Sequence, residues 1–205
     1  MEKRIITISR EYGSGGRQIG LMAAKRLGME FYDKELIDAA AKEIGFPSEM
    51  IADREQRLTN SLLYNFAVGT IYGRAYPRDP DVRELPLTEQ IFLAQKRAIE
   101  EAAGRHSAVF IGRCADAILE GRDDLLRVFI YADPKIRKQR AIEEYGDLED
   151  YIDDFMKETD KRRRIHYENY TNQKWGAKEN YDLMLNSGLL GIDKCIEMVC
   201  LAAKG

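Results

Sequence analysis

The sequence predicts an α/β protein whose parallel β-sheet is covered by helices on both faces. Two observations support this fold class. Five short apolar runs recur along the chain, and the stretches between them carry apolar residues at helical spacing. Continuous apolar strands that alternate with helices are typical of parallel sheets buried on both faces. The 205 residues are enough for one domain, 1–205, with an inserted lobe.

The first part of the chain predicts two strands and two helices. Residues 5–8 form a β-branched run, which favours a buried strand. A glycine-rich segment follows, and then an amphipathic helix that Gly28 ends. Phe31 and Tyr32 end a second short strand, and Asp33 is placed to cap the helix after it.

The segment 47–86 differs in composition from the strands and helices before it, because its aromatic residues are interspersed with glycines and prolines. We interpret it as an inserted, partly helical lobe with a loop around 74–83. A long helix resumes near Thr88, a capping residue, and runs to about Ala103. The aromatic residues of the lobe could equally form a dimer surface, so a homodimer is one partner to consider.

The second half of the chain continues the alternation. Strands are expected at 108–112, 128–132 and 183–185. Pro134 suits the first turn of the helix that follows the second of these strands. A further helix begins near 148 and runs into the basic segment 161–164, and a last helix spans 192–203.

Composition excludes several classes of function. The net charge of −3 disfavours a basic nucleic-acid binder. Three cysteines without a CxxC pair, and two histidines, do not provide a zinc site. The odd thiol count and the absence of a signal peptide favour the reducing cytoplasm. No apolar run has the roughly 18 residues of a membrane helix, so no membrane partner is expected.

In a parallel α/β sheet, ligands bind at the carboxyl ends of the strands. The turns that leave those ends are therefore the places to search. They are 10–17, Asp33, 112–116, 133–137 and 186–191.

The turn after the first strand is rich in glycine. Glycines let the backbone turn sharply and aim N–H groups inward, and the helix that follows adds its positive dipole end. We therefore predict a phosphate cradle, although a tight turn without a ligand is the alternative. Its expected members are Gly13, Ser14, Gly15, Gly16, Arg17 and Gln18.

The match of this turn to the phosphate-loop pattern GxxxxGK[ST] is incomplete. Gly16 stands where the lysine belongs, and Arg17 comes one residue late. Counted from Arg17 as the cation, Gln18 takes the place of the hydroxyl residue that would hold magnesium, which leaves Ser14 as the nearest hydroxyl and a weak metal candidate. Arg17, or Arg10, would supply the missing cation.

Several motifs in order resemble the cytidylate kinase-like family across nearly the whole chain, least clearly over 47–86. The first pair comprises Ile-Ser-Arg-Glu-Tyr-Gly-Ser-Gly-Gly at 8–16 and Phe-Tyr-Asp-Lys-Glu-Leu-Ile at 31–37. The others are Ile-Gly-Arg-Cys-Ala-Asp at 111–116, Asp-Lys-Arg-Arg at 160–163, Tyr-Glu-Asn-Tyr-Thr at 167–171, Trp-Gly at 175–176 and Tyr-Asp-Leu at 181–183.

The resemblance implies the three-layer P-loop kinase fold of nucleoside-monophosphate kinases. That fold has a five-stranded parallel sheet, an inserted monophosphate-binding helical lobe (here 47–86) and an arginine-bearing lid (here about 147–176). It also implies ATP as donor, Mg²⁺ as cofactor, and CMP or dCMP as acceptor. A nucleotide-binding protein with little catalysis, or a kinase for a different acceptor, remains the alternative.

The resemblance also suggests acceptor-binding residues. Arg113 is similar to the arginine of a Gly-Arg-Asp motif that grips the acceptor phosphate, although Asp116 comes three residues later instead of directly after. The alternative is a structural pair between Arg113 and Asp116. Asp33 is similar to an aspartate near the acceptor site, and an N-cap explains it equally well.

The remaining candidates belong to the expected lid and donor site. Asp160 and Arg163 or Arg164 share a helix face, which could hold an arginine toward the transferring phosphate when the lid closes. Arg137 is expected near the donor, unless it belongs to a solvated helix face. Asn186 resembles part of the loop beside the donor base.

Overall fold

The computed structural model describes residues 2–33 and 85–205. The predicted lobe at 47–86 lies almost wholly outside these residues, and so does the helix expected after Asp33. The description below covers the remainder of the chain.

The described residues contain a five-stranded parallel sheet in the order β2-β3-β1-β4-β5. Its strands are β1 (Ile5–Arg10), β2 (Glu30–Tyr32), β3 (Ala108–Ile111), β4 (Leu125–Tyr131) and β5 (Leu183–Asn186). All five strands predicted from the apolar runs are confirmed. Strand β1 is central, since its Ile5 pairs with Ala108 on one side and with Leu125 on the other.

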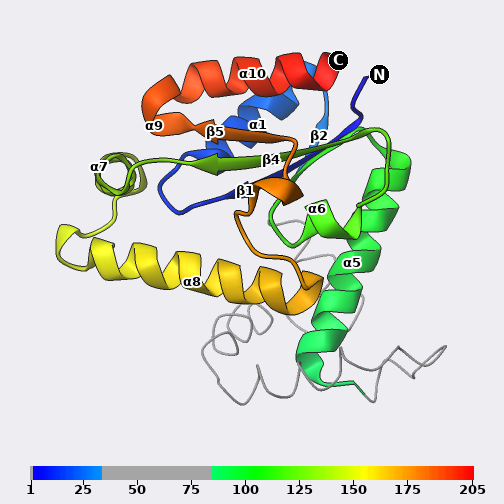
Figure 1. Ribbon diagram of the computed structural model, residues 1–205, viewed down its shortest axis with the longest axis horizontal. Helices are drawn as coiled ribbons and strands as arrows, with labels where there is room; N and C mark the ends of the chain where they lie inside the picture. The colour runs from blue at the N-terminus through cyan, green and yellow to red at the C-terminus, as the bar shows by residue number, and fades with distance from the viewer. Residues whose placement is uncertain (1, 34–84) are drawn as a thin grey trace.

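Helices cover both faces of the sheet and form three layers (Figure 1). One face carries α1 (Gly16–Leu27) and α10 (Ile192–Lys204). The opposite side carries α5 (Leu87–Arg105), α6 (Ala115–Ile118) and α8 (Ile152–Thr171). The other elements are α7 (Pro134–Tyr145), α9 (Ser187–Leu190) and the 3₁₀ turns η2 (Glu149–Tyr151) and η3 (Lys178–Asn180). None of the described helices is both long and apolar enough to cross a membrane.

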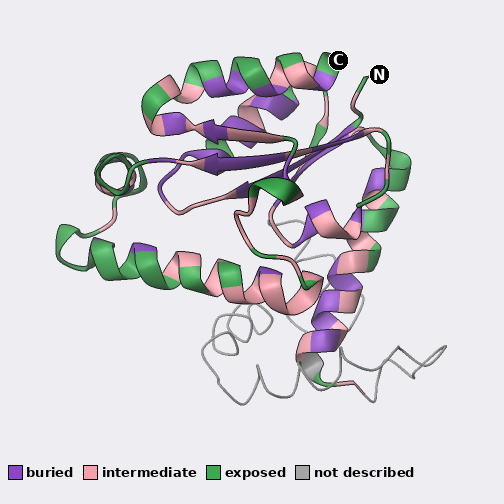
Figure 2. Ribbon diagram, viewed as in Figure 1, coloured by how far each residue is buried: buried purple, intermediate pink, exposed green. Residues whose placement is uncertain are grey.

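The core follows the alternation of side chains along β1. Ile6 and Ile8 point toward α1 and α10, where they pack with Ile19 and Val199. Ile5 points to the other face and packs near Phe110. Because successive strand residues face opposite sides, one central strand supplies both layers with buried side chains (Figure 2).

Local signals place several helix ends correctly. Gly28 ends α1 with φ 66°, a left-handed conformation that glycine adopts at little cost. The Asp133 side chain accepts a hydrogen bond from the Lys135 N–H at the start of α7, and Pro134 occupies the first turn. The predicted cap Thr88 was wrong, because Pro86 precedes α5 and its carbonyl accepts from the N–H groups of Glu89 and Gln90.

Candidate functional site: an arginine-lined cavity

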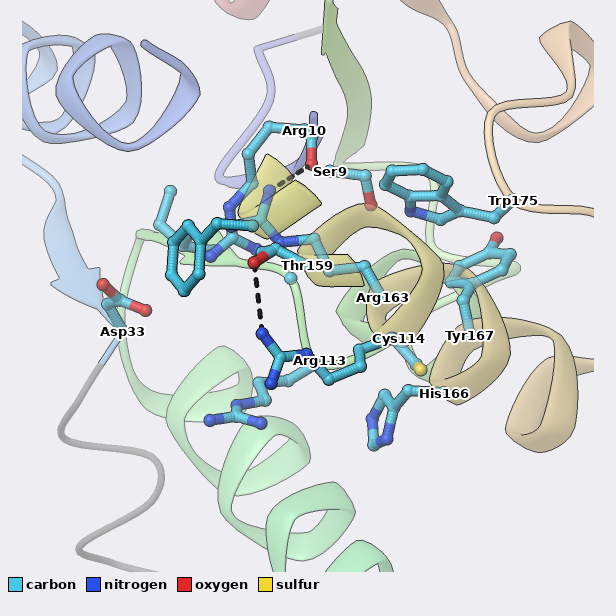
Figure 3. Close-up of a pocket in the computed structure, with 14 residues that line it drawn as sticks. Ser9, Arg10, Asp33, Arg113, Cys114, Thr159, Arg163, His166, Tyr167 and Trp175 are labelled. Atoms are coloured by element: carbon cyan, nitrogen blue, oxygen red, sulfur yellow. Dashed lines mark hydrogen bonds between the residues drawn. The ribbon is translucent and has the colours of Figure 1, made fainter. Parts of the chain in front are cut away.

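A cavity of about 410 Å³ opens between the carboxyl ends of β1 and β3 and the helix α8 (Figure 3). The strands and the turns after them contribute Ser9, Arg10, Asp33, Ile111, Gly112, Arg113 and Cys114. The rest of the lining comes from α8 and the segment after it: Phe155, Thr159, Arg162, Arg163, His166, Tyr167 and Trp175. The cavity therefore lies at the sheet edge where the sequence predicted a ligand site.

The cavity carries an excess of positive charge. Its described lining has four arginines, at positions 10, 113, 162 and 163, against one carboxylate, that of Asp33. Burial, together with the neighbouring Arg163, lowers the pKa of Arg10 to about 9. Burial also lowers the pKa of Arg163, although Asp160 opposes the change. A bound anion would relieve this repulsion, so the cavity is suited to a phosphate group.

The turn after β3 presents Arg113 to the cavity through an unusual backbone. Gly112, Arg113 and Cys114 have φ of 68°, 58° and 56°, so three successive residues are left-handed. Each non-glycine residue in this region costs about 1–3 kcal/mol, and such strain is concentrated at functional sites. The turn closes when the N–H of Ala115 donates to the Gly112 carbonyl, and α6 begins there.

Asp116 lies behind this turn and does not line the cavity. Its side chain is buried, and its carboxylate accepts a hydrogen bond from the Tyr167 hydroxyl at 2.8 Å. Burial raises the pKa of Asp116 to about 6. The carboxylate of Asp116, which was expected to contact substrate, joins α6 to α8 inside the protein instead of lining the cavity.

Asp160 organises the cavity wall from outside it. Its carboxylate accepts from the backbone N–H of Tyr12 at 2.7 Å and from Nη1 of Arg137 at 2.5 Å. It also accepts from Nη1 of Arg163 at 3.4 Å, and Arg163 donates in turn to the Arg10 carbonyl at 3.0 Å. This carboxylate of α8 thus links the loop that follows β1 to α7. It also holds Arg163 in place.

Arg137 and Arg140 brace the glycine loop. Nη1 of Arg137 donates to the Tyr12 carbonyl at 3.1 Å, and Nη1 of Arg140 donates to the Gly13 carbonyl at 2.8 Å. Nε of Arg137 lies 3.5 Å from a Glu11 carboxylate oxygen, and the side chain is 11% exposed. The predicted donor contact of Arg137 is not what this geometry shows, since its guanidinium is engaged within the protein.

The glycine loop is packed tightly and does not line the cavity. A Cβ on Gly13 would lie 2.5 Å from the Arg137 carbonyl oxygen, and one on Gly15 would overlap the Ile192 side chain. Ser14 is buried, and its hydroxyl donates to the Glu11 carbonyl at 2.8 Å. The prediction of Ser14 as a metal ligand does not fit this arrangement.

The loop continues directly into α1. Gly16, Arg17 and Gln18 form the first turn of that helix, whose N–H groups lack acceptors within the helix. Those N–H groups are the part of the predicted cradle that can still bind a phosphate.

Arg17 and Arg10, the two candidates for the missing cation, lie in different places. Arg17 has a 60% exposed side chain, and its Nε donates to Asp33 at 2.7 Å. Its guanidinium carbon is 5.7 Å from the centre of the Phe31 ring. Arg10 lines the cavity itself, while Arg17 reaches only its rim through Asp33.

Two further candidates lie away from the cavity. Arg164 is exposed and is not among the lining residues, whereas its neighbour Arg163 faces inward. The Asn186 side chain accepts from the N–H groups of Gly188 and Leu189, at 3.0 and 3.1 Å. Asn186 therefore serves as the cap of α9 in the described structure, rather than as a donor contact.

Sequence reasoning did not select several lining residues. Arg162 belongs to the basic segment but was not among the predicted site residues, and its Nη2 donates to the Thr159 hydroxyl at 3.2 Å. Phe155 and His166 complete the same wall. The spacing 155, 159, 162, 166 follows one face of a helix, so this signal was present in the sequence.

The chain matches one known protein family along most of its length. The profile described as the cytidylate kinase-like family matches residues 5–189. No curated protein matches the chain.

Solved structures share the fold at low sequence identity. An uncharacterised protein from Eubacterium ventriosum ATCC 27560 is 24% identical over 97% of both chains, with a TM-score of 0.71. TT1252 from Thermus thermophilus is 16% identical over 100% of both chains, with a TM-score of 0.52. A shikimate kinase from Bacteroides thetaiotaomicron is 13% identical over 97% of both chains, and its TM-score of 0.48 is too low to carry an argument. These likenesses concern the fold alone.

Proposed function

Because the chain belongs to the cytidylate kinase-like family, we propose that it is a phosphotransferase. It would move the terminal phosphoryl group of ATP to a nucleoside monophosphate, with CMP or dCMP favoured. The observation that carries this proposal is the cavity at the ends of β1 and β3, where four arginines face one carboxylate. Arginine binds phosphate oxygens with two parallel hydrogen bonds, so such a lining favours phosphate ligands.

The reaction needs positioning and positive charge rather than a protein nucleophile. An oxygen of the acceptor phosphate would donate its electron pair to the terminal phosphorus of ATP. The bond from that phosphorus to the bridging oxygen would break, and its electron pair would leave with the nucleoside diphosphate. Arg113 and Arg162 would hold the acceptor, and Arg163 would stabilise charge on the transferring group.

The described residues offer little for a resident Mg²⁺. Magnesium in kinases is bound by one or two carboxylates together with substrate phosphates. The Ser14 hydroxyl is buried, and the Asp33 carboxylate is bound by Arg17. No cluster of three potential ligands occurs in residues 2–33 and 85–205. We therefore infer that Mg²⁺ would enter the site bound to the phosphates of ATP.

The aromatic side of the cavity suits a planar group. Trp175 and Tyr167 lie at the end opposite Asp33 (Figure 3). Flat aromatic surfaces stack on nucleobases, which supports a nucleotide acceptor over a purely inorganic one.

A coupled assay of nucleoside diphosphate release tests the proposal. ATP and magnesium are supplied with CMP, dCMP, UMP, AMP or GMP, and one reaction has no acceptor. We expect turnover that depends on CMP or dCMP. The variant Arg113→Met should lose it, and Arg105→Met, which alters a surface arginine of α5, should not. Silence with every acceptor would contradict the proposal.

One observation favours a second candidate function. Gly16 stands at the lysine position of the phosphate-loop pattern, and the Ser14 hydroxyl is turned into the protein. A nucleotide-binding protein with little or no kinase activity would have these features. It would show ATP-dependent thermal stabilisation without product in the assay above. Product with an acceptor outside the panel would indicate a kinase of different specificity.

A further inference from the structure

Two positions of the phosphate-loop pattern have exchanged their residue types in this chain. When Gly15 is aligned with the second glycine of GxxxxGK, the lysine position falls on Gly16 and the first glycine position falls on Arg10. The cation and the glycine thus stand in each other's places. The exchange suggests that Arg10 supplies the positive charge that the missing lysine would have provided.

The structure shows that the two positions compete for one volume. A Cβ on Gly16 would lie 2.5 Å from the Cβ of Arg10 and 3.0 Å from its Cγ. Atoms held that close would overlap, so a lysine at 16 and an arginine at 10 exclude each other. The stem of Arg10 therefore occupies the space that the first carbon of a lysine side chain would need.

The charged end of Arg10 extends toward the turn after β3. A Cβ on Gly112 would overlap Nη1 of Arg10, so a side chain there would have to displace the end of the guanidinium. The guanidinium reaches the cavity that Arg113 and Arg163 also line (Figure 3). Arg163 donates to the carbonyl of Arg10 at 3.0 Å, which ties the backbone of this residue to α8.

We propose that Arg10 is the phosphate-binding cation of this chain, in place of the lysine that starts the helix in other phosphate loops. It enters from the last residue of β1 instead of from the first turn of α1. From there it lies between the N–H groups at the start of α1 and the acceptor cavity, where the transferring phosphoryl group would pass. The inference rests on the proposed function for its donor, ATP.

Two features support Arg10 over Arg17. Arg17 is mostly exposed and is paired with Asp33, so its charge is already balanced at the rim. Arg10 is partly buried beside Arg163 and Arg113, and although Asp33 opposes the change, burial and these like charges lower its pKa, so a bound anion would favour the charged form. A planar guanidinium can also contact two phosphate oxygens at once, which one ammonium cannot do in the same geometry.

The first test measures ATP binding by isothermal titration calorimetry. Loss of a buried, charge-assisted contact weakens binding by about tenfold or more. We expect that loss for Arg10→Met, a smaller loss for Arg10→Lys, and affinity within about twofold of wild type for the surface control Arg105→Met. Unchanged ATP affinity in Arg10→Met would overturn the inference.

The second test reverses the exchange. Arg10→Gly should bind ATP poorly, and Gly16→Lys alone should be destabilised by the overlap with Arg10. The double variant Arg10→Gly/Gly16→Lys restores the GxxxxGK pattern and should regain most of the lost ATP affinity. A folded double variant that binds no better than Arg10→Gly would contradict the inference. If the double variant does not fold, the comparison of Arg10→Met with Arg10→Lys decides.

Failure of this inference is distinguishable from failure of the proposed function. Wild type that binds ATP but yields no product with any acceptor contradicts the phosphotransferase, while the variants still report on Arg10 through affinity. Wild type that yields product, with Arg10→Met unchanged in affinity and turnover, contradicts only the role of Arg10. Absence of ATP binding by wild type would contradict both.

Discussion

At the scale of single residues, the cavity is built from side chains whose neighbours in sequence point elsewhere. Arg163 faces the cavity while its neighbour Arg164 is exposed. The rotation of about 100° per helical residue separates these two side chains. Arg164 therefore provides a matched control for Arg163.

Arg163 and Arg164 give the first prediction at this scale. Arg163→Ala should lower kcat on the order of a hundredfold, because an aligned positive charge is lost from the transferring group. ATP affinity should fall much less, and Arg164→Ala should lower kcat less than Arg163→Ala. Steady-state kinetics and calorimetry measure the two quantities. Equal losses of turnover and affinity in Arg163→Ala would count against this role.

Glycines 112 and 28 give the second prediction. Both have positive φ, 68° and 66°, but a Cβ meets Arg10 at Gly112 and open space at Gly28. Gly28→Ala should cost about 1 kcal/mol of unfolding free energy from backbone strain alone. Gly112→Ala carries the same strain and should also displace the Arg10 guanidinium, so it should weaken ATP binding while Gly28→Ala does not. Urea unfolding measures the stability costs and calorimetry the affinities, and unchanged ATP affinity in Gly112→Ala would contradict the placement of Arg10.

At the scale of elements, α8 connects the rest of the site. Through Asp160 it reaches the loop after β1 and α7, and through Tyr167 it reaches α6. These contacts hold a long helix over the cavity with its 155–166 face inward. If the helix serves as a lid, as the family resemblance implied, opening it requires the Asp160 contacts to break.

The α6–α8 contact predicts a pH dependence of stability. Burial raises the pKa of Asp116 from its usual value of 3.8 to about 6, with Tyr167 and Arg127 opposing the change. Between these values the folded state binds more protons than the unfolded state, so this group's contribution to stability falls as pH rises. The unfolding free energy of wild type should therefore decline relative to Asp116→Asn from about pH 4 to pH 6. A difference that is constant across this range would contradict the assignment.

At the scale of the whole molecule, the described lining of the cavity holds four arginines in a chain with a net charge of −3. The local excess of arginine at the ends of β1 and β3 is opposite in sign to the protein as a whole. Such an arrangement directs anionic ligands to one site without making the surface generally attractive to polyanions.

Anions that bind in or beside this cavity should therefore stabilise the fold. ATP at about a hundred times its dissociation constant adds roughly 2.7 kcal/mol, which raises Tm by about 5–10 °C in a chain of this size. Inorganic phosphate should raise Tm by less, and chloride at equal ionic strength should leave it nearly unchanged. Arg113→Met should reduce the phosphate effect in differential scanning fluorimetry. An equal effect of phosphate in both proteins would place the anion elsewhere.

The strands, the end of α1 at Gly28, Pro134 in the first turn of α7, the sheet edge with the cavity and the family could all be predicted from the sequence alone. Those features depend on local periodicity, turn chemistry and motifs that stand contiguously in the chain. Of the candidate residues, Arg113, Arg163 and Asp33 do line the cavity.

The arginines that share the cavity, and the carboxylates that are bonded inside the protein, depend on contacts between residues far apart in the sequence. Asp160 meets Tyr12 across 148 residues of sequence, and Asp116 meets Tyr167 across 51. Such partners are set by how α8 packs on the ends of β1 and β3. The exchange between Arg10 and Gly16 is visible in the sequence. Only the structure shows that side chains at these two positions would occupy the same space. Such a steric conflict depends on how the strand and the helix pack together, so sequence periodicity and turn motifs do not show it.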